Sequence, residues 1–361
     1  MHALLAALIL AAPPPPQLKP SMQAAMTSVV TLQPLLASPT AFRDPANAET
    51  IRASLDTLAP LDHFFSSGVS SPIASLFSNE IAKAKGEFAT RDTEAARARL
   101  RSVSSLCFAC HLRQPTAKDI AAATGADTLT PLERASFYAT TRQFDRALAE
   151  WKRLFATEPK NDVEAFEQTQ ALRTALSVAV QGKDDPDAVI ALLEQNRPRK
   201  ALPGIVTRQL ERWLVEAKAW QAEKFVASKS APAVLVTRAK ALIEMTGAAK
   251  QLTADDARLI SHLRASGYLL EALRRDPNAS FRPEALYLLG VVSAANTDPA
   301  LWRLEWLTLE SCIRENPKTE LARQCADRLT ERTYFTYTGR DGLALPANLL
   351  SELGALAALA K

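Results

Sequence analysis

Apolar residues recur at the spacing of a helix face along most of the chain. From Met22 to Val30 they fall at i, i+3, i+4, i+7 and i+8, the pattern of a helix with one buried side. We expect Pro34 to end this helix and Pro60 the next, because proline lacks an amide hydrogen and its ring clashes with the preceding turn. A fourth helix is expected to begin after Asp92 as its N-cap. The four segments span about 22–33, 51–58, 73–88 and 92–110. They predict an antiparallel four-helix bundle.

Beyond Pro115 the pattern becomes a succession of helical hairpins. The stretch 133–159 resembles a tetratricopeptide repeat, whose 34-residue period places small and large apolar residues at set positions of two helices. Those positions hold Ala135, Tyr138, Ala147, Trp151, Leu154 and the closing Pro159. A looser second copy contains Leu289 and Gly290 and closes at Pro317. Because such helix pairs bury one face only by stacking on their neighbours, the pattern predicts an α-solenoid.

Composition narrows the class of protein. The 361 residues are 47% hydrophobic and 23% charged, enough to bury an ordinary core, and the length favours two domains. The net charge is +4, and the basic residues are scattered, so we do not expect nucleic acid as a partner. Glycine is scarce at 11 residues, and no glycine-rich phosphate loop occurs, which argues against nucleotide enzymes.

The N-terminus has the features of an export signal. An apolar run from Ala3 to Ala12 is followed by four prolines and is too short to cross a bilayer as a helix. We therefore expect a secretory signal and a periplasmic protein with no membrane span beyond that segment. Retention of the segment as a tether, or a buried helix that starts at Met1, are the alternatives.

The pentapeptide Cys107–His111 carries the candidate chemistry. Cys107, Cys110 and His111 form the C-x-x-C-H arrangement of covalent c-type haem attachment. Residues three and four apart share a helix face, so both cysteines can bond one haem while His111 turns toward the iron. One motif implies one haem. A redox disulfide and a zinc site that also uses Cys312 and Cys325 are the alternatives.

The segment from about residue 20 to 115 resembles the class II cytochromes c, the family of cytochrome c-prime. The resemblance rests on CFACH at the end of the fourth helix, on AETIRASL at the start of the second, and on the proline in LAPLDHFF. It implies that His111 is the fifth iron ligand and that a first-helix residue sets the sixth position. That position falls on Met26, with Met22 one turn earlier as an alternative and His63 as a further candidate. Pro115 stands where the family has a basic residue, so the family's partners for the haem carboxylates do not carry over.

The sixth position decides between two functions. A methionine thioether there makes a low-spin iron of raised potential, suited to electron transfer, whereas an apolar residue leaves the iron open to small gases. Methionine at helical spacing is also a common core residue. The haem motif favours the ligand role for Met26.

Cys312 and Cys325 lie about equally far from the turn at Pro317 and Lys318, on opposite arms of one predicted hairpin. Their side chains can therefore meet across it. In an oxidising compartment this spacing predicts a structural disulfide, and two buried free thiols are the alternative.

Together these features predict an all-α periplasmic protein in four parts. These are a signal peptide at 1–19, a class II cytochrome c-like four-helix haem bundle at 20–116, an α-solenoid of tetratricopeptide-like helical hairpins at 117–340 and a C-terminal capping helix at 341–361. The expected function is electron transfer by one covalently attached haem c, with the repeats docking a redox or assembly partner. No nucleophile–base pair occurs, so we do not expect an enzyme. A gas-binding or gas-sensing haem protein and an assembly scaffold with a structural haem are the alternatives, and the oligomeric state stays open.

Overall fold

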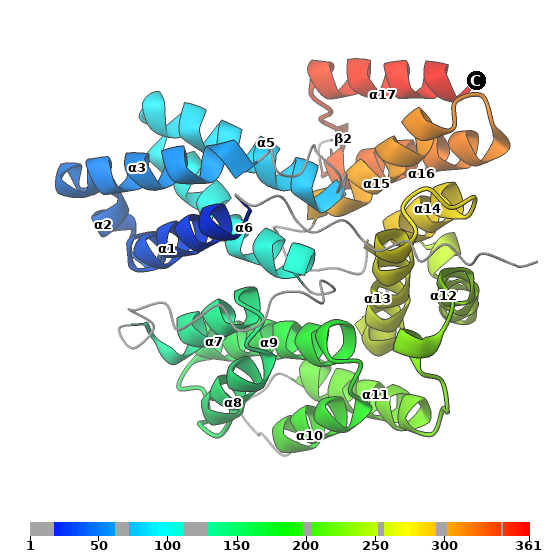
Figure 1. Ribbon diagram of the computed structural model, residues 1–361, viewed down its shortest axis with the longest axis horizontal. Helices are drawn as coiled ribbons and strands as arrows, with labels where there is room; N and C mark the ends of the chain where they lie inside the picture. The colour runs from blue at the N-terminus through cyan, green and yellow to red at the C-terminus, as the bar shows by residue number, and fades with distance from the viewer. Residues whose placement is uncertain are drawn as a thin grey trace, which may run out of the picture.

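Helices make up almost all of the computed structural model, which describes residues 18–61, 72–111, 129–197, 204–251, 256–293, 302–340 and 342–361 (Figure 1). The strands in these ranges are β1 (Thr338–Gly339) and β2 (Gly342–Leu343), which pair antiparallel. The described chain is therefore all-α, as its sequence patterns predicted. The predicted signal peptide lies outside the described residues except for Leu18 and Lys19, which open the first helix, and His63 lies outside them as well.

The N-terminal helices occupy the segments that the apolar stripes predicted. They are α1 (Leu18–Ala37), α2 (Pro39–Arg43), α3 (Ala48–Leu58), α5 (Pro72–Ala89) and α6 (Thr93–His111). The helix α3 ends before Pro60, and Asp92 caps α6 by accepting a hydrogen bond from the amide of Ala95 at 3.3 Å. The short α2, capped by the Ser38 side chain, was not predicted.

The prediction that Pro34 ends the first helix was wrong. Helix α1 continues to Ala37 with Pro34 inside it. Proline removes the hydrogen bond from its own nitrogen, but Leu32 and Leu36 on either side are buried against the core of these helices. Burial of two leucine side chains outweighs one lost backbone bond.

One apolar core joins α1, α2, α3, α5 and α6. Its members include Leu32, Phe42, Ile51, Leu55, Leu58, Ile81, Leu100 and Val103. Helices α5 and α6 form an antiparallel hairpin in which Arg99 bonds the carboxylates of Glu80 at 2.9 Å and Glu87 at 2.6 Å. These two ion pairs therefore help to set the register of α6 along α5.

The later helices pack mainly against their neighbours in the chain. They are α7 (Pro131–Thr140), α8 (Phe144–Phe155), α9 (Asp162–Ser177), α10 (Pro186–Asn196), α11 (Gly204–Gln221), α12 (Pro232–Thr246), α13 (Leu259–Arg275), α14 (Arg282–Ser293), α15 (Trp302–Glu315), α16 (Glu320–Tyr337) and α17 (Ala347–Ala360). A π-helical segment, Val178–Gly182, extends α9. Two apolar clusters, one from α7 to α13 and one from α12 to α17, form their interior.

Residues singled out by the repeat resemblance lie in these interiors. Ala135 on α7 and Ala147 and Trp151 on α8 are completely buried in the same cluster. Gly290 on α14 faces α15 so closely that a Cβ atom there would lie 2.7 Å from Leu309 Cδ2. Only glycine lets these two helices approach this far.

The N-terminal helices meet the later ones at two places, which we call the junction. Met26 of α1 packs with Leu129 and with Phe137 of α7. Leu304 of α15 belongs to the N-terminal core, and Leu270 of α13 packs against that core. The two sets of helices therefore share buried apolar surface.

Candidate functional site

The C-x-x-C-H motif forms the last turns of α6. Cys107, Cys110 and His111 are its closing helical residues, and their spacing of three and four places them on one face of the helix. Figure 1 shows α6 ending near the middle of the molecule. Helix α6 packs against both α1 and α7.

Helix α1, which carries both candidate methionines, packs against α6. The Arg97 side chain of α6 donates from Nη1 to the backbone oxygen of Leu36 at 2.7 Å, which anchors the end of α1 beside the beginning of α6. Further along, Leu100 and Leu32, then Val103 and Val29, share one core, as expected for helices that run in opposite directions. Both helices rise about 1.5 Å per residue. From helix rise alone we therefore expect Met26 to fall near the level of Cys107 and Met22 near that of His111.

Met22 and Met26 lie in different surroundings. Met22 packs against the core of the N-terminal helices. Met26 is only 4% exposed and packs with Leu129 and Phe137, with Val30 and Tyr138 at the margin. The prediction that Met26 ligates iron stays a prediction.

Leu129 and Phe137 are buried neighbours of Met26 that sequence reasoning missed. Both lie beyond residue 116, where the haem domain was expected to end. A signal was present, because Phe137 is two residues from Ala135 and from Ala139, about 200° around the helix from each. An apolar residue opposite the repeat face indicates a helix buried on both sides.

A cationic group lies in the turn that follows α7. Arg142 has a left-handed backbone with φ of 61°, and its Nε and Nη1 atoms are buried without a hydrogen-bond partner among the described residues. Burial lowers the pKa of Arg142, and the nearby positive charge of Arg274 lowers it further. This electrostatic situation is unfavourable in the protein taken alone.

A haem requires apolar walls, iron ligands and cations for its two carboxylate groups. The described residues of α1, α7 and the turn after α7 supply a buried apolar wall, two methionines and a guanidinium with two buried nitrogens that have no acceptor among the described residues. These features fit the requirements of a haem.

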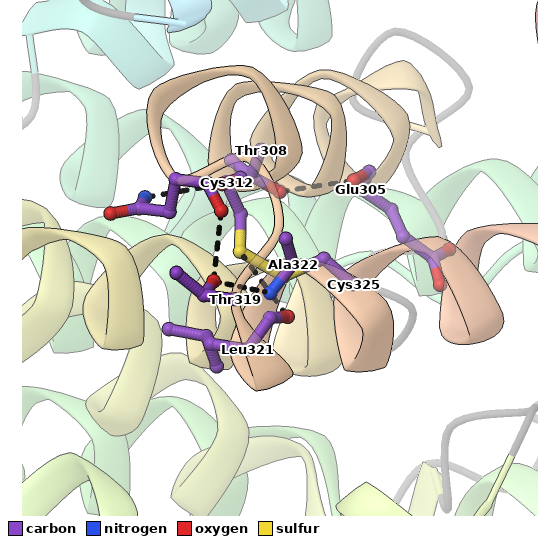
Figure 2. The surroundings of a disulfide bond; sticks show 8 residues. Glu305, Thr308, Cys312, Thr319, Leu321, Ala322 and Cys325 are labelled. Atoms are coloured by element: carbon purple, nitrogen blue, oxygen red, sulfur yellow. Dashed lines mark hydrogen bonds between the residues drawn. A yellow bond between two sulfur atoms is a disulfide. The ribbon is translucent and has the colours of Figure 1, made fainter. Parts of the chain in front are cut away.

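Cys312 and Cys325 are joined by a disulfide, with sulfur atoms 2.08 Å apart and Cα atoms 6.4 Å apart (Figure 2). The bond links α15 to α16 across the predicted hairpin, and both cysteines are fully buried. Thr319 caps α16 beside it by accepting a hydrogen bond from the amide of Ala322 at 3.1 Å. The bond takes up two of the four thiolates that the alternative zinc site would need.

Two searches of the described residues bear on other sites. Within these residues no three side chains of His, Cys, Asp or Glu gather where they could hold a metal ion. None of the described helices combines the length and the apolar character needed to cross a membrane.

Comparisons with known proteins give the chain no family. No family model matches it, and neither the curated proteins nor the solved structures contain a match.

Proposed function

We propose that the protein is an exported mono-haem c-type cytochrome that transfers electrons one at a time. The observation that carries the proposal is the C-x-x-C-H motif in the last turns of α6, which packs against the helix that carries Met22 and Met26. A haem attached there supplies the reversible one-electron step. Export to the periplasm follows from the apolar N-terminal segment and from the compartment in which such haems are attached.

The chain's own residues would hold and tune the group. Cys107 and Cys110 are the proposed thioether tethers, and His111 is the proposed axial ligand. Met26 is the leading sixth ligand, and Met22 is the alternative on the same helix. Leu129 and Phe137 exclude water from Met26, and a dry, thioether-ligated site raises the reduction potential.

We further propose that the long N-terminal helices form a bundle of the class II cytochrome c type. The later helices would then form an α-solenoid of tetratricopeptide-like hairpins with α17 as its cap. Packing in chain order and the close contact at Gly290 support this arrangement. A solenoid of this kind would dock the redox or assembly partner.

Two methionine variants test the ligand assignment. Met26→Ala should convert a low-spin visible spectrum to a high-spin one with new carbon monoxide binding by the ferrous protein. Met22→Ala is the matched control, because it removes the same side chain one helical turn away, and its spectrum should stay low-spin. The reverse pattern would move the ligand to Met22. Rapid carbon monoxide binding by the unaltered protein would favour the gas-binding alternative instead.

A further inference from the structure

Arg142 is the clearest electrostatic imbalance in the described part of the chain. Two of its three guanidinium nitrogens, Nε and Nη1, are buried and find no acceptor among the residues described. A buried donor to which nothing binds loses its hydration without compensation, and this cost is larger for a charged group. The left-handed φ of 61° at the same residue belongs to the turn that ends α7, where the amide of Gln143 bonds the carbonyl oxygen of Tyr138 at 2.8 Å. The two buried donors without an acceptor are therefore the feature that points to a group that completes the site.

Arg274 adds a second positive charge close by. It acts on Arg142 through space, and its guanidinium already bonds the carboxylate of Glu271 through Nε at 3.0 Å and Nη2 at 2.9 Å. Glu271 is shared with Arg275, which it contacts at 2.6 Å. One carboxylate therefore serves two guanidinium groups on α13, and a positive charge is left over beside Arg142.

The two arginines lie at the junction. Arg274 is one helical turn beyond Leu270, on the side of α13 that packs against the core of the N-terminal helices. Arg142 follows Phe137, which covers Met26. Helix α7 also packs against α6, whose last turns carry Cys107 and His111. Thus the excess charge lies near the end of the bundle where the haem is proposed.

We propose that Arg142 binds a carboxylate group of the haem, with the positive charge of Arg274 beside it. This inference rests on the proposed function. Haem carries carboxylate groups, and a guanidinium binds a carboxylate through charge-assisted hydrogen bonds, for which Nε and Nη1 of Arg142 have no other acceptor among the described residues, whereas Arg274 contributes charge while it stays paired with Glu271. Both arginines lie outside the segment that resembles the class II cytochromes c. The later helices therefore complete the haem site as well as extending the protein.

The redox potential of the full-length haem protein tests the site. Arg142→Gln and Arg274→Gln should each lower the ratio of reduced to oxidised protein at fixed ambient potential, because loss of a cation favours the ferric state. A tenfold fall corresponds to 59 mV for a one-electron couple. Arg142→Lys, which keeps the charge, should recover most of the lost ratio of reduced to oxidised protein. The control is Arg153→Gln, which removes an exposed arginine of α8 that pairs with Glu150 at 2.8 Å, and its potential should not change.

A haem-free variant separates this role from a structural one. In the full chain with Cys107→Ala and Cys110→Ala, Arg142→Gln should leave the melting temperature unchanged or raise it, since the charge has no partner there. In the haem protein the same substitution should lower it. Equal losses in both forms, or an unchanged potential, would overturn the proposal.

Two further outcomes distinguish the sources of failure. Absence of covalent haem from the unaltered protein would remove the proposed function itself. A second outcome has three parts: haem is present, Arg142→Gln leaves the potential unchanged, and sodium succinate stabilises the haem-free chain only while Arg142 is intact. In that case the site binds a free carboxylate, and its assignment to the haem is overturned.

Discussion

Two arginines show how differently two regions of this protein balance charge. Arg264 on α13 is 4% exposed and bonds Glu223 through two parallel hydrogen bonds of 3.0 and 2.6 Å. Its guanidinium also lies 5.0 Å from the Trp220 ring. Arg142 at the junction has two buried nitrogens and no acceptor among the described residues. The charge of Arg264 is therefore matched by a carboxylate within the later helices, whereas Arg142 has the charge pattern of a site that needs another group.

The largest expected effect comes from breaking the complete site. Glu223→Ala leaves the Arg264 charge buried without its partner and should lower the free energy of unfolding by about 3 kcal/mol, measured by urea denaturation. Replacing Arg264 by methionine as well should recover part of the loss. Glu194→Ala, which breaks the exposed pair with Lys218, is the control and should cost only a small fraction of it. A similar cost for both single variants would mean that burial does not set the energy of the pair.

The disulfide is the next largest expected contribution. Replacing Cys312 and Cys325 together by serine should lower the free energy of unfolding by about 2 to 3 kcal/mol, because the open chain gains entropy when it unfolds. Thermal unfolding with and without a reductant should show the same difference. Haem content should not change, since the bond lies between α15 and α16. Loss of haem in the double variant would contradict the expectation that the α15–α16 disulfide does not influence the proposed haem site.

Substitutions at two glycines compare how closely helices pack around α14, among the later helices, and around α5, among the N-terminal helices. Gly290→Ala places a Cβ atom 2.7 Å from Leu309 and should cost about 2 kcal/mol by forcing α14 and α15 apart. A Cβ atom at Gly86 in α5 would meet no side chain or neighbouring helix within 4 Å, so Gly86→Ala should instead stabilise the protein by about 0.5 to 1 kcal/mol. Opposite signs of ΔTm in a thermal scan are the expected result. A gain in stability at Gly290 would rule out the close approach of the two helices.

The smallest expected effect is a difference in pH dependence between two glutamates. Burial raises the pKa of Glu216, against the hydrogen bonds from Ser261. The folded state therefore holds this proton longer, and stability is lost as pH rises from the ordinary glutamate range through the raised pKa. Glu216→Gln should remove that loss.

Glu271 should behave in the opposite way. Burial opposes its ionisation, but hydrogen bonds from Arg274 and Arg275 bring its pKa below the ordinary value. Its stabilising effect is present above the ordinary glutamate range and is lost as pH falls through the lowered pKa. Glu271→Gln should therefore flatten the acid side of the stability curve. Denaturation curves from about pH 3 to 8 compare both variants with the unaltered protein, and identical slopes in all three would contradict both assignments.

The sequence predicts local features of this fold better than it predicts contacts between distant segments. Helix starts follow from residues such as Asp92, and the hairpin that pairs Cys312 with Cys325 follows from their spacing around one turn. These features depend on neighbours in the chain. Pro34 was misjudged because the buried leucines on either side of it are stabilised by other helices.

The candidate site divides in the same way. The motif at Cys107–His111 is visible in the sequence because its chemistry requires a fixed local spacing. The burial of Met26 under Phe137 joins residues far apart in the chain, and the charge of Arg142 matters only because α13 brings Arg274 near it. No local pattern contains that information.

Covalent haem at Cys107 and Cys110 is the central claim, and the intact mass of the exported protein tests it most directly. The full chain, produced in a host that matures c-type cytochromes, should carry the mass of one haem that denaturation and reduction do not remove. The Cys107→Ala, Cys110→Ala chain should carry none. An unaltered protein without this added mass would contradict the account and return the two cysteines to a redox role.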